Sequence, residues 1–158
     1  MKIEKFVQNS LLLAIGSSYD TILRGLNSKL KQENCNLMQA LILISLFFEK
    51  NDTVSPSQLA EILGTTRGNI SHGVSHLEKR RLLRRKLNEK DARSYQLILR
   101  PEGRRLAVKL IQTIDSVENY FEQKFGAQEV RGTVQRIARF RAAYVSSEAG
   151  KILPSTPV

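Results

Sequence analysis

The stretch that decides the fold is SPSQLAEILGTTRGNISHGVSHLEKR, residues 55–80. It opens with a helix start, because Ser55 can cap the first turn, the proline after it suits that turn, and Gln58 can bond back to the cap. Gly64 is placed to end this short helix, and the Thr65-Thr66 pair can cap a second helix reaching about residue 80. Two capped helices joined by a glycine turn predict a helix-turn-helix.

The spacing of Ala60, Gly64 and Ile70 supports this prediction. Ala60 is small enough for the two helices to cross closely, and Gly64 can take the positive φ of the turn. Ile70, a β-branched residue of the second helix, packs against the first helix. With Ile70 inward, the helical period turns the opposite stripe of the second helix outward. Such a recognition helix reads bases mainly with its N-terminal turns. The predicted base contacts are Arg67, Asn69, Ser71 and His72.

Two short strands are expected next, at 83–87 and 95–99, with a polar segment between them. Residues 79–105 hold eleven lysines and arginines and three acidic residues, a net +8 of the chain's +10. A basic hairpin beside a recognition helix suits phosphates and a narrow minor groove. The predicted contacts to the DNA backbone and minor groove are Ser57, Thr66, Lys79, Arg84, Arg85, Lys86, Lys90 and Arg93.

Helices are predicted on both sides of this segment. Apolar residues at helical spacing indicate one long helix over residues 3–30. Asn36 and Gln39 form a capping pair for an apolar, buried helix over 37–49. Pro101 opens a long helix through Phe125, and a final helix covers about 128–146. The fold class is therefore mainly α, with a winged helix-turn-helix and a two-stranded β wing.

Composition limits the class of protein. A chain of 158 residues with 41% hydrophobic residues can bury the core of one soluble domain. Its longest apolar run, residues 40–48, is too short to cross a membrane, and the apolar core of residues 1–16 is too short for a signal peptide. The single cysteine, Cys35, excludes a disulfide within the chain and favours a reducing cytoplasm. We interpret it as a small buried residue, with a redox-sensing thiol as the alternative.

No enzymatic activity is expected. The chain shows no Ser-His-Asp set, no phosphate-binding glycine loop and no pair of carboxylates placed for acid–base chemistry. His72 and His76 have the i, i+4 spacing of a zinc site, but no further ligands complete it, so neither a metal nor a cofactor is predicted. The main alternative to a sequence-specific regulator is a non-specific architectural nucleic-acid-binding protein.

The order of these helices, the helix-turn-helix and the wing along the chain resembles that of the MarR family of bacterial regulators. The resemblance rests on these stretches: residues 57–64, 70–71 and 74–78 of the quoted segment, LLRR at residues 82–85, Asp91-Ala92-Arg93, and LILRPEG at residues 97–103. It implies an obligate homodimer with interlocking first and last helices. It also implies that Arg93 enters the minor groove and that Asp91 orients neighbouring arginines. The chain departs from the family pattern at three places: Arg81 replaces a glycine, Arg100 replaces a threonine cap, and Asn88-Glu89-Lys90 replaces a proline near the wing tip.

From these observations we predict a cytoplasmic, sequence-specific repressor that binds double-stranded DNA as a homodimer on a pseudo-palindromic operator. A small-molecule effector is left open, with Tyr19 and Arg24 as candidate ligand-cleft residues. The expected parts are an N-terminal dimerisation helix (1–34), a winged lobe (35–100, with its recognition helix at about 66–80 and its wing at about 83–99), C-terminal dimerisation helices (101–146) and a flexible tail (147–158).

Overall fold

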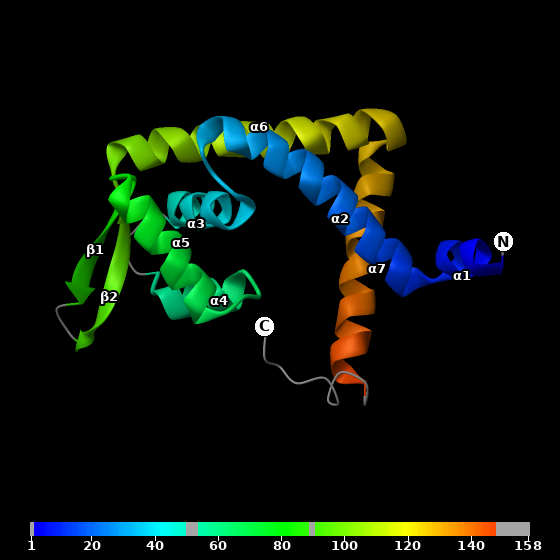
Figure 1. Cartoon of the computed structure of the whole chain (residues 1–158), viewed down its shortest axis with the longest axis horizontal. Helices are drawn as coiled ribbons and strands as arrows, with labels where there is room; N and C mark the ends of the chain where they lie inside the picture. Colours follow the sequence, from blue (N-terminus) through cyan, green and yellow to red (C-terminus); the bar gives the residue numbers. More distant parts are fainter. Residues whose placement is uncertain (1, 50–53, 89–90, 148–158) are drawn as a thin grey trace. The chain divides into compact units, whose positions relative to one another are not determined.

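A computed structural model describes residues 2–49, 54–88 and 91–147; for residues 88 and 91–94 it describes the backbone alone. The chain is mainly helical, with one two-stranded antiparallel sheet (Figure 1). The predicted fold class is confirmed. The chain consists of two compact units, residues 1–113 and 114–158. The predicted flexible tail lies outside the described residues from 148 onward.

The N-terminal segment forms two helices, α1 (Lys2–Asn9) and α2 (Leu11–Leu30), followed by the short 3-10 helix η1 (Lys31–Glu33). The prediction of one continuous helix over residues 3–30 is wrong. Ser10 has an extended backbone (φ −91°, ψ 115°), and its Oγ accepts a hydrogen bond from the Leu13 N–H at 3.4 Å. A serine that caps the following helix in this way interrupts the helix before it.

Helix α3 (Leu37–Phe48) begins with the predicted capping box. The Asn36 side chain accepts from the Gln39 N–H at 2.9 Å, and the Gln39 side chain accepts from the Asn36 N–H at 3.1 Å. Ile42 and Leu43 are completely buried, so α3 is the central helix that its apolar sequence predicts.

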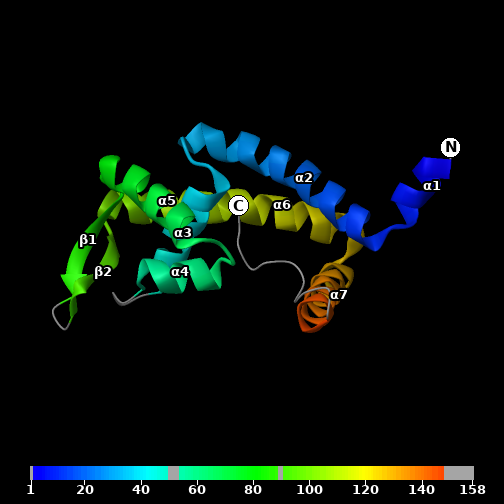
Figure 2. The ribbon, with the colours of Figure 1, turned by 60° about the horizontal axis from the view of Figure 1, so that its bottom comes forward.

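The helix-turn-helix consists of α4 (Pro56–Ile62) and α5 (Arg67–Lys79). Ser55 and Gln58 exchange both bonds of a capping box, at 3.3 and 2.8 Å. Gly64 has a φ of +60° in the turn, and Thr66 Oγ1 accepts from the Asn69 N–H at 3.0 Å. Both predicted caps and the predicted glycine turn are therefore confirmed. Figure 2 shows α3, α4 and α5 grouped beside the sheet.

The wing consists of β1 (Leu83–Asn88) and β2 (Asp91–Leu99). Leu83 lies opposite Leu99 and Leu87 opposite Tyr95, with an irregularity between Leu87 and Asn88. The strands therefore extend further toward the wing tip than the predicted 83–87 and 95–99.

The core of the first unit joins α3, α4, α5, the base of the wing and the first half of α6 (Pro101–Phe125). Leu106, Ala107 and Leu110 of α6 are buried. In α7 (Ala127–Ser146) no residue is buried, and Gly126, with a φ of +86°, separates the two helices. Over the described residues, no helix is long and apolar enough to span a membrane.

Candidate nucleic-acid interface

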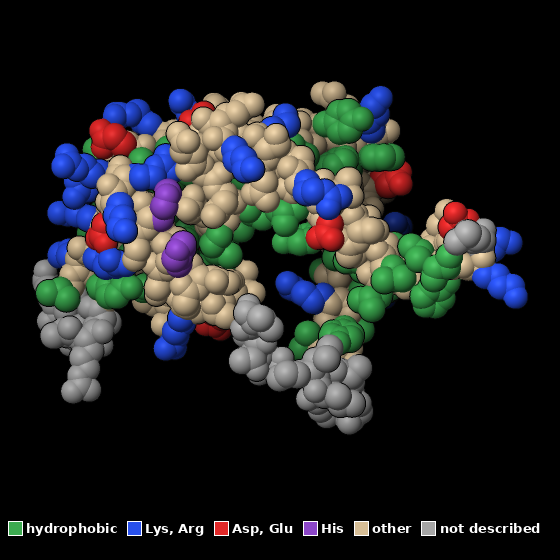
Figure 3. All heavy atoms as spheres, in the orientation of Figure 1, with side chains coloured by type: hydrophobic (Ala, Val, Ile, Leu, Met, Phe, Trp, Pro, Cys, Tyr) green, Lys and Arg blue, Asp and Glu red, His purple; other side chains and the backbone are tan. Residues whose placement is uncertain are grey.

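Helix α5 has one buried face and one exposed face. Ile70 is fully buried, as predicted, and so are Val74 and Leu77, four and seven residues further along the same face. Of the four predicted base-contact residues, Arg67, Asn69 and His72 are exposed and Ser71 is half-buried. The two histidines lie on the same visible face of the molecule (Figure 3). The outward stripe of α5 is thus a continuous polar surface with a packed core behind it.

The two glycines of α5 differ in their surroundings. Gly68 is exposed, and a Cβ there would meet only Thr66 Oγ1, at 3.6 Å. Gly73 is buried, and a Cβ there would lie 2.7 Å from Ile42 Cδ1 of α3. Gly73 therefore allows α5 to approach α3 closely, whereas Gly68 leaves the backbone bare on the outer face of the first turn.

The N-terminal end of α5 is held in place by hydroxyl groups. The Asn69 side-chain amide donates to Thr65 Oγ1 at 3.2 Å, and the Asn69 backbone N–H donates to Thr66 Oγ1. The first bond fixes the direction of an exposed amide, which is the side chain that pairs with adenine in direct readout. The half-buried Thr66 uses its hydroxyl as a cap acceptor.

Exposed cations surround α5 on the wing side. Lys79, Arg84 and Lys86 are exposed, and Arg84 and Lys86 share one face of β1 because side chains alternate along a strand. Lysine and arginine side chains gather over this part of the molecule (Figure 3). Ser57, in the first turn of α4, is half-buried.

Three predicted wing residues fall outside the described side chains. Lys90 is not described, and for Asp91 and Arg93 the structure gives the β2 backbone only. The minor-groove contact of Arg93 and the orienting role of Asp91 therefore stay predictions.

Arg85 has a different environment from the other predicted phosphate contacts. Its guanidinium forms an ion pair with Glu78, donates to Ser75 Oγ at 2.9 Å, and lies 5.2 Å from the ring centre of Tyr95. Its backbone N–H also donates to Glu78 Oε1 at 3.1 Å. These contacts join the wing to the recognition helix and occupy Arg85 within the chain. Glu78 and Ser75 were not among the predicted site residues, and their only signal in the sequence is an acidic residue seven positions before an arginine.

Arg80, at the C-terminal end of α5, binds the segment before α3. Its Nη1 donates to the Asn34 carbonyl at 2.6 Å and contacts Cys35 Sγ at 3.4 Å, and its Nη2 donates to the Glu33 carbonyl at 3.1 Å. Cys35 is 3% exposed, so its predicted burial is confirmed. The alternative, a redox-sensing thiol, stays a prediction.

The effector candidates lie on α2. Tyr19 and Arg24 are both exposed, and Arg24 donates to Thr21 Oγ1 at 3.4 Å. Their place in a ligand cleft stays a prediction. Within the described ranges, no group of three His, Cys, Asp or Glu side chains is positioned to hold a metal ion.

Residues 36–94, which contain α3, the helix-turn-helix and most of the wing, match the model of the MarR family. The resemblance to the MarR family is confirmed. The transcriptional repressor MprA of Escherichia coli K12 is a MarR-type relative, 32% identical over 82 residues that make up 52% of this chain and 47% of MprA. The chain thus spans about half the length of this curated relative.

Solved structures of MarR-type regulators share the fold. The MepR–DNA complex of Staphylococcus aureus superposes with a TM-score of 0.78 at 17% identity, covering 85% of this chain and 97% of MepR. CouR of Rhodococcus jostii, bound to p-coumaroyl-CoA, gives a TM-score of 0.67 at 22% identity, covering 84% of this chain and 94% of CouR. At these identities the likeness concerns the fold.

Proposed function

We propose that this chain is a sequence-specific DNA-binding transcription regulator, acting as a repressor in the bacterial cytoplasm. The observation that carries the proposal is the exposed stripe of α5, where Arg67, Asn69 and His72 stand on a helix whose opposite face is buried. This is the geometry of a helix that enters the major groove and reads base edges. The similarity to a transcriptional repressor and to a regulator solved with DNA supports it.

The wing and the end of α5 supply the contacts that carry no sequence information. Lys79, Arg84 and Lys86 are exposed, and each phosphate that a cation neutralises releases counterions and adds to affinity. Arg93 is assigned to the minor groove on the strength of the resemblance to the MarR family. Arg85 is assigned a positioning role, because its guanidinium holds the wing against α5.

The regulator is proposed to act as a homodimer. Large apolar side chains are exposed along α2 and along α7, among them Leu12 at 76% and Val134 at 61% exposure. Exposed apolar surface on this scale marks an interaction site. A symmetric dimer would place two α5 helices in successive major grooves about 10 bp apart, on a pseudo-palindromic operator. Release by a small ligand is part of the proposal, supported by the ligand-bound state of CouR.

The test is the selection of bound duplexes from a randomised library at roughly 150 mM salt, where electrostatic binding is partly screened. An enriched inverted repeat is the expected result. Binding without any enriched sequence would replace the proposal with the architectural alternative, and the absence of binding to any duplex would contradict both.

A further inference from the structure

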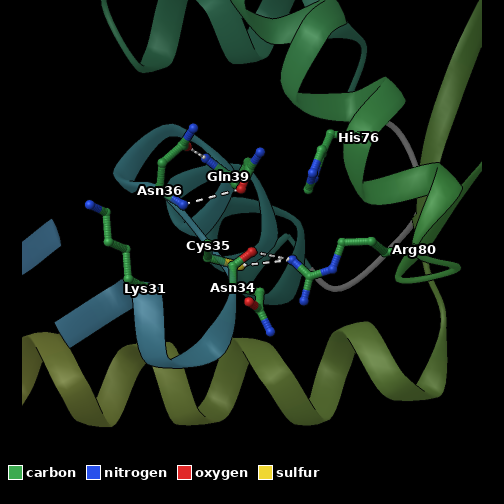
Figure 4. A pocket seen from close by; sticks show the side chains of 7 residues that line it. All are labelled: Lys31, Asn34, Cys35, Asn36, Gln39, His76 and Arg80. Atoms are coloured by element: carbon green, nitrogen blue, oxygen red, sulfur yellow. Dashed lines mark hydrogen bonds between the residues drawn. The ribbon is translucent and has the colours of Figure 1, made fainter. Parts of the chain in front are cut away.

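A hollow of about 530 Å³ lies beside the C-terminal end of the recognition helix (Figure 4). Its lining comes from η1, the turn before α3, the first turn of α3 and the C-terminal end of α5, all within the first unit of the chain. Its volume is in the range of pockets that hold small molecules. The lining residues are Lys31, Asn34, Cys35, Asn36, Gln39, His76 and Arg80.

The charged side chains that line this hollow are all basic. Its lining contains two permanent cations, Lys31 and Arg80, one histidine, and no carboxylate. Within the described part of the chain, neither cation has a carboxylate oxygen within 4.0 Å; the Glu33 carboxylate lies 3.8 Å from Lys109 instead. The remaining polar lining consists of three amide side chains, which donate as well as accept hydrogen bonds.

Arg80 is held in a fixed orientation by hydrogen bonds that use only some of its N–H groups. Its bonds to Asn34, Cys35 and Glu33 go to two carbonyls and a thiol, which leave the guanidinium charge uncompensated. These bonds use three of the five N–H groups that a guanidinium carries. A preorganised, uncompensated guanidinium is the group best suited to binding a carboxylate or a phosphate.

We infer that this hollow is an oxyanion site, which takes a carboxylate or phosphate group beside Arg80 and His76, with the exposed Lys31 on the other side of the hollow (Figure 4). The group can belong to a small organic anion or to a phosphate of bound DNA. Its position connects it with the recognition helix, because His76 lies on the exposed stripe of α5 and Arg80 follows the last residue of that helix. A small anion bound here would alter the surface that α5 presents to DNA. That regulatory consequence rests on the proposed function; the binding itself does not.

The experiment uses the full chain and inorganic phosphate at constant ionic strength. The chain has only two histidines, so imidazole resonances in NMR spectra report on His76, with His72 of the same helix as an internal reference. A saturable shift of the His76 resonance with a smaller shift at His72 is expected. The substitution Lys31→Gln should weaken phosphate binding about three-fold, whereas Lys29→Gln, which removes an exposed lysine outside the lining, should not change it. Arg80→Gln should weaken it about ten-fold or more.

A second measurement, DNA binding without added phosphate, separates the two sources of the anion. If the site takes a DNA phosphate, Lys31→Gln lowers DNA affinity and reduces the salt slope by about 1 relative to Lys29→Gln. If it takes a small anion, the two variants bind DNA equally and differ only in phosphate affinity. The inference is overturned if His76 shows no saturable shift, or if the two lysine variants are equal in both measurements. A chain that bound phosphate but no DNA would contradict the proposed function and leave the pocket in place.

Discussion

Gly103 packs directly against the backbone carbonyl of Leu82. A Cβ built on Gly103 would lie 1.9 Å from the Leu82 oxygen and 2.9 Å from its carbonyl carbon. The same oxygen accepts a hydrogen bond from the Arg100 N–H at 3.0 Å. Leu82 precedes β1 and Arg100 follows β2, so this contact closes the base of the wing onto the start of α6.

Replacing Gly103 by alanine is therefore expected to destabilise the protein by at least about 2 kcal/mol, because the obstructing atoms belong to the backbone and cannot rotate away. Urea unfolding followed by circular dichroism measures this change. Gly68→Ala is the matched control: it also lies in the first turn of a helix, but its Cβ would meet only one side-chain oxygen at 3.6 Å. Its free energy of unfolding should stay equal or rise slightly. Equal stability of the two variants would contradict this account of Gly103.

The ion pair between Glu78 and Arg85 should set the position of the wing relative to α5. Glu78→Gln is expected to lower DNA affinity, since the freed wing loses its fixed orientation. Stability should fall by only about 0.5–1 kcal/mol, because both side chains are partly exposed and screened by solvent. Fluorescence anisotropy with a selected duplex at several salt concentrations measures the affinity and its salt slope. The slope should not change if Arg85 positions the wing, as proposed, because its guanidinium is then not one of the cations that neutralise a phosphate.

Glu102→Gln is the control for Glu78→Gln. It removes the same charge from an exposed pair with Arg105, whose two side chains are 58% and 71% accessible. This variant should match the wild type in stability and in DNA affinity. If Glu78→Gln also left both stability and DNA affinity unchanged, the contacts of Arg85 would have no positioning role.

Binding experiments should distinguish residues that contact bases from residues that contact phosphates. Asn69→Ala and His72→Ala are each expected to relax base preference at one position per half-site, at a cost of about 1–3 kcal/mol for the preferred base. Arg84→Ala should weaken binding to all sequences alike and reduce the salt slope by about 1. Library selection for each variant, with salt titrations for the third, measures both effects. Unchanged base preference in both α5 variants would show that the register assigned to the recognition helix is wrong.

The parts of the fold that local chemistry determines could be predicted from the sequence. The caps at Ser55 and Thr66 and the positive φ of Gly64 depend on residues at most four positions apart. The break at Ser10 was missed because the apolar period continues across it, and periodicity does not detect a single capping residue. The partners of long charged side chains such as Arg85 depend on tertiary packing, so sequence patterns cannot assign them.

Arg81 has a φ of +58°, in the left-handed region that favours glycine, at the position where the family pattern has glycine. Arg81→Gly is expected to stabilise the protein by about 1 kcal/mol through relief of this strain, less the entropy that glycine adds to the unfolded chain. Asn34→Gly is the control, since Asn34 has a φ of +53° but asparagine tolerates this region well. Thermal unfolding of the two variants measures the change, and the gain in stability from Asn34→Gly should be the smaller one. An Arg81→Gly variant less stable than the wild type would mean that Arg81 makes a favourable contact larger than its strain.

The exposed apolar face of α7 should be a subunit interface. Val134, Ile137 and Phe140 are 61%, 47% and 47% exposed and recur every three residues along the helix. We expect the wild type to sediment as a dimer at micromolar concentrations and Ile137→Glu to weaken that dimer at least about ten-fold, because a charge would be buried without a partner. Gln135→Glu adds a negative charge to the same helix at an exposed polar position and should leave the dimer intact. A wild-type chain that sedimented as a monomer throughout this range would contradict the homodimer, and equal weakening by both variants would place the interface elsewhere.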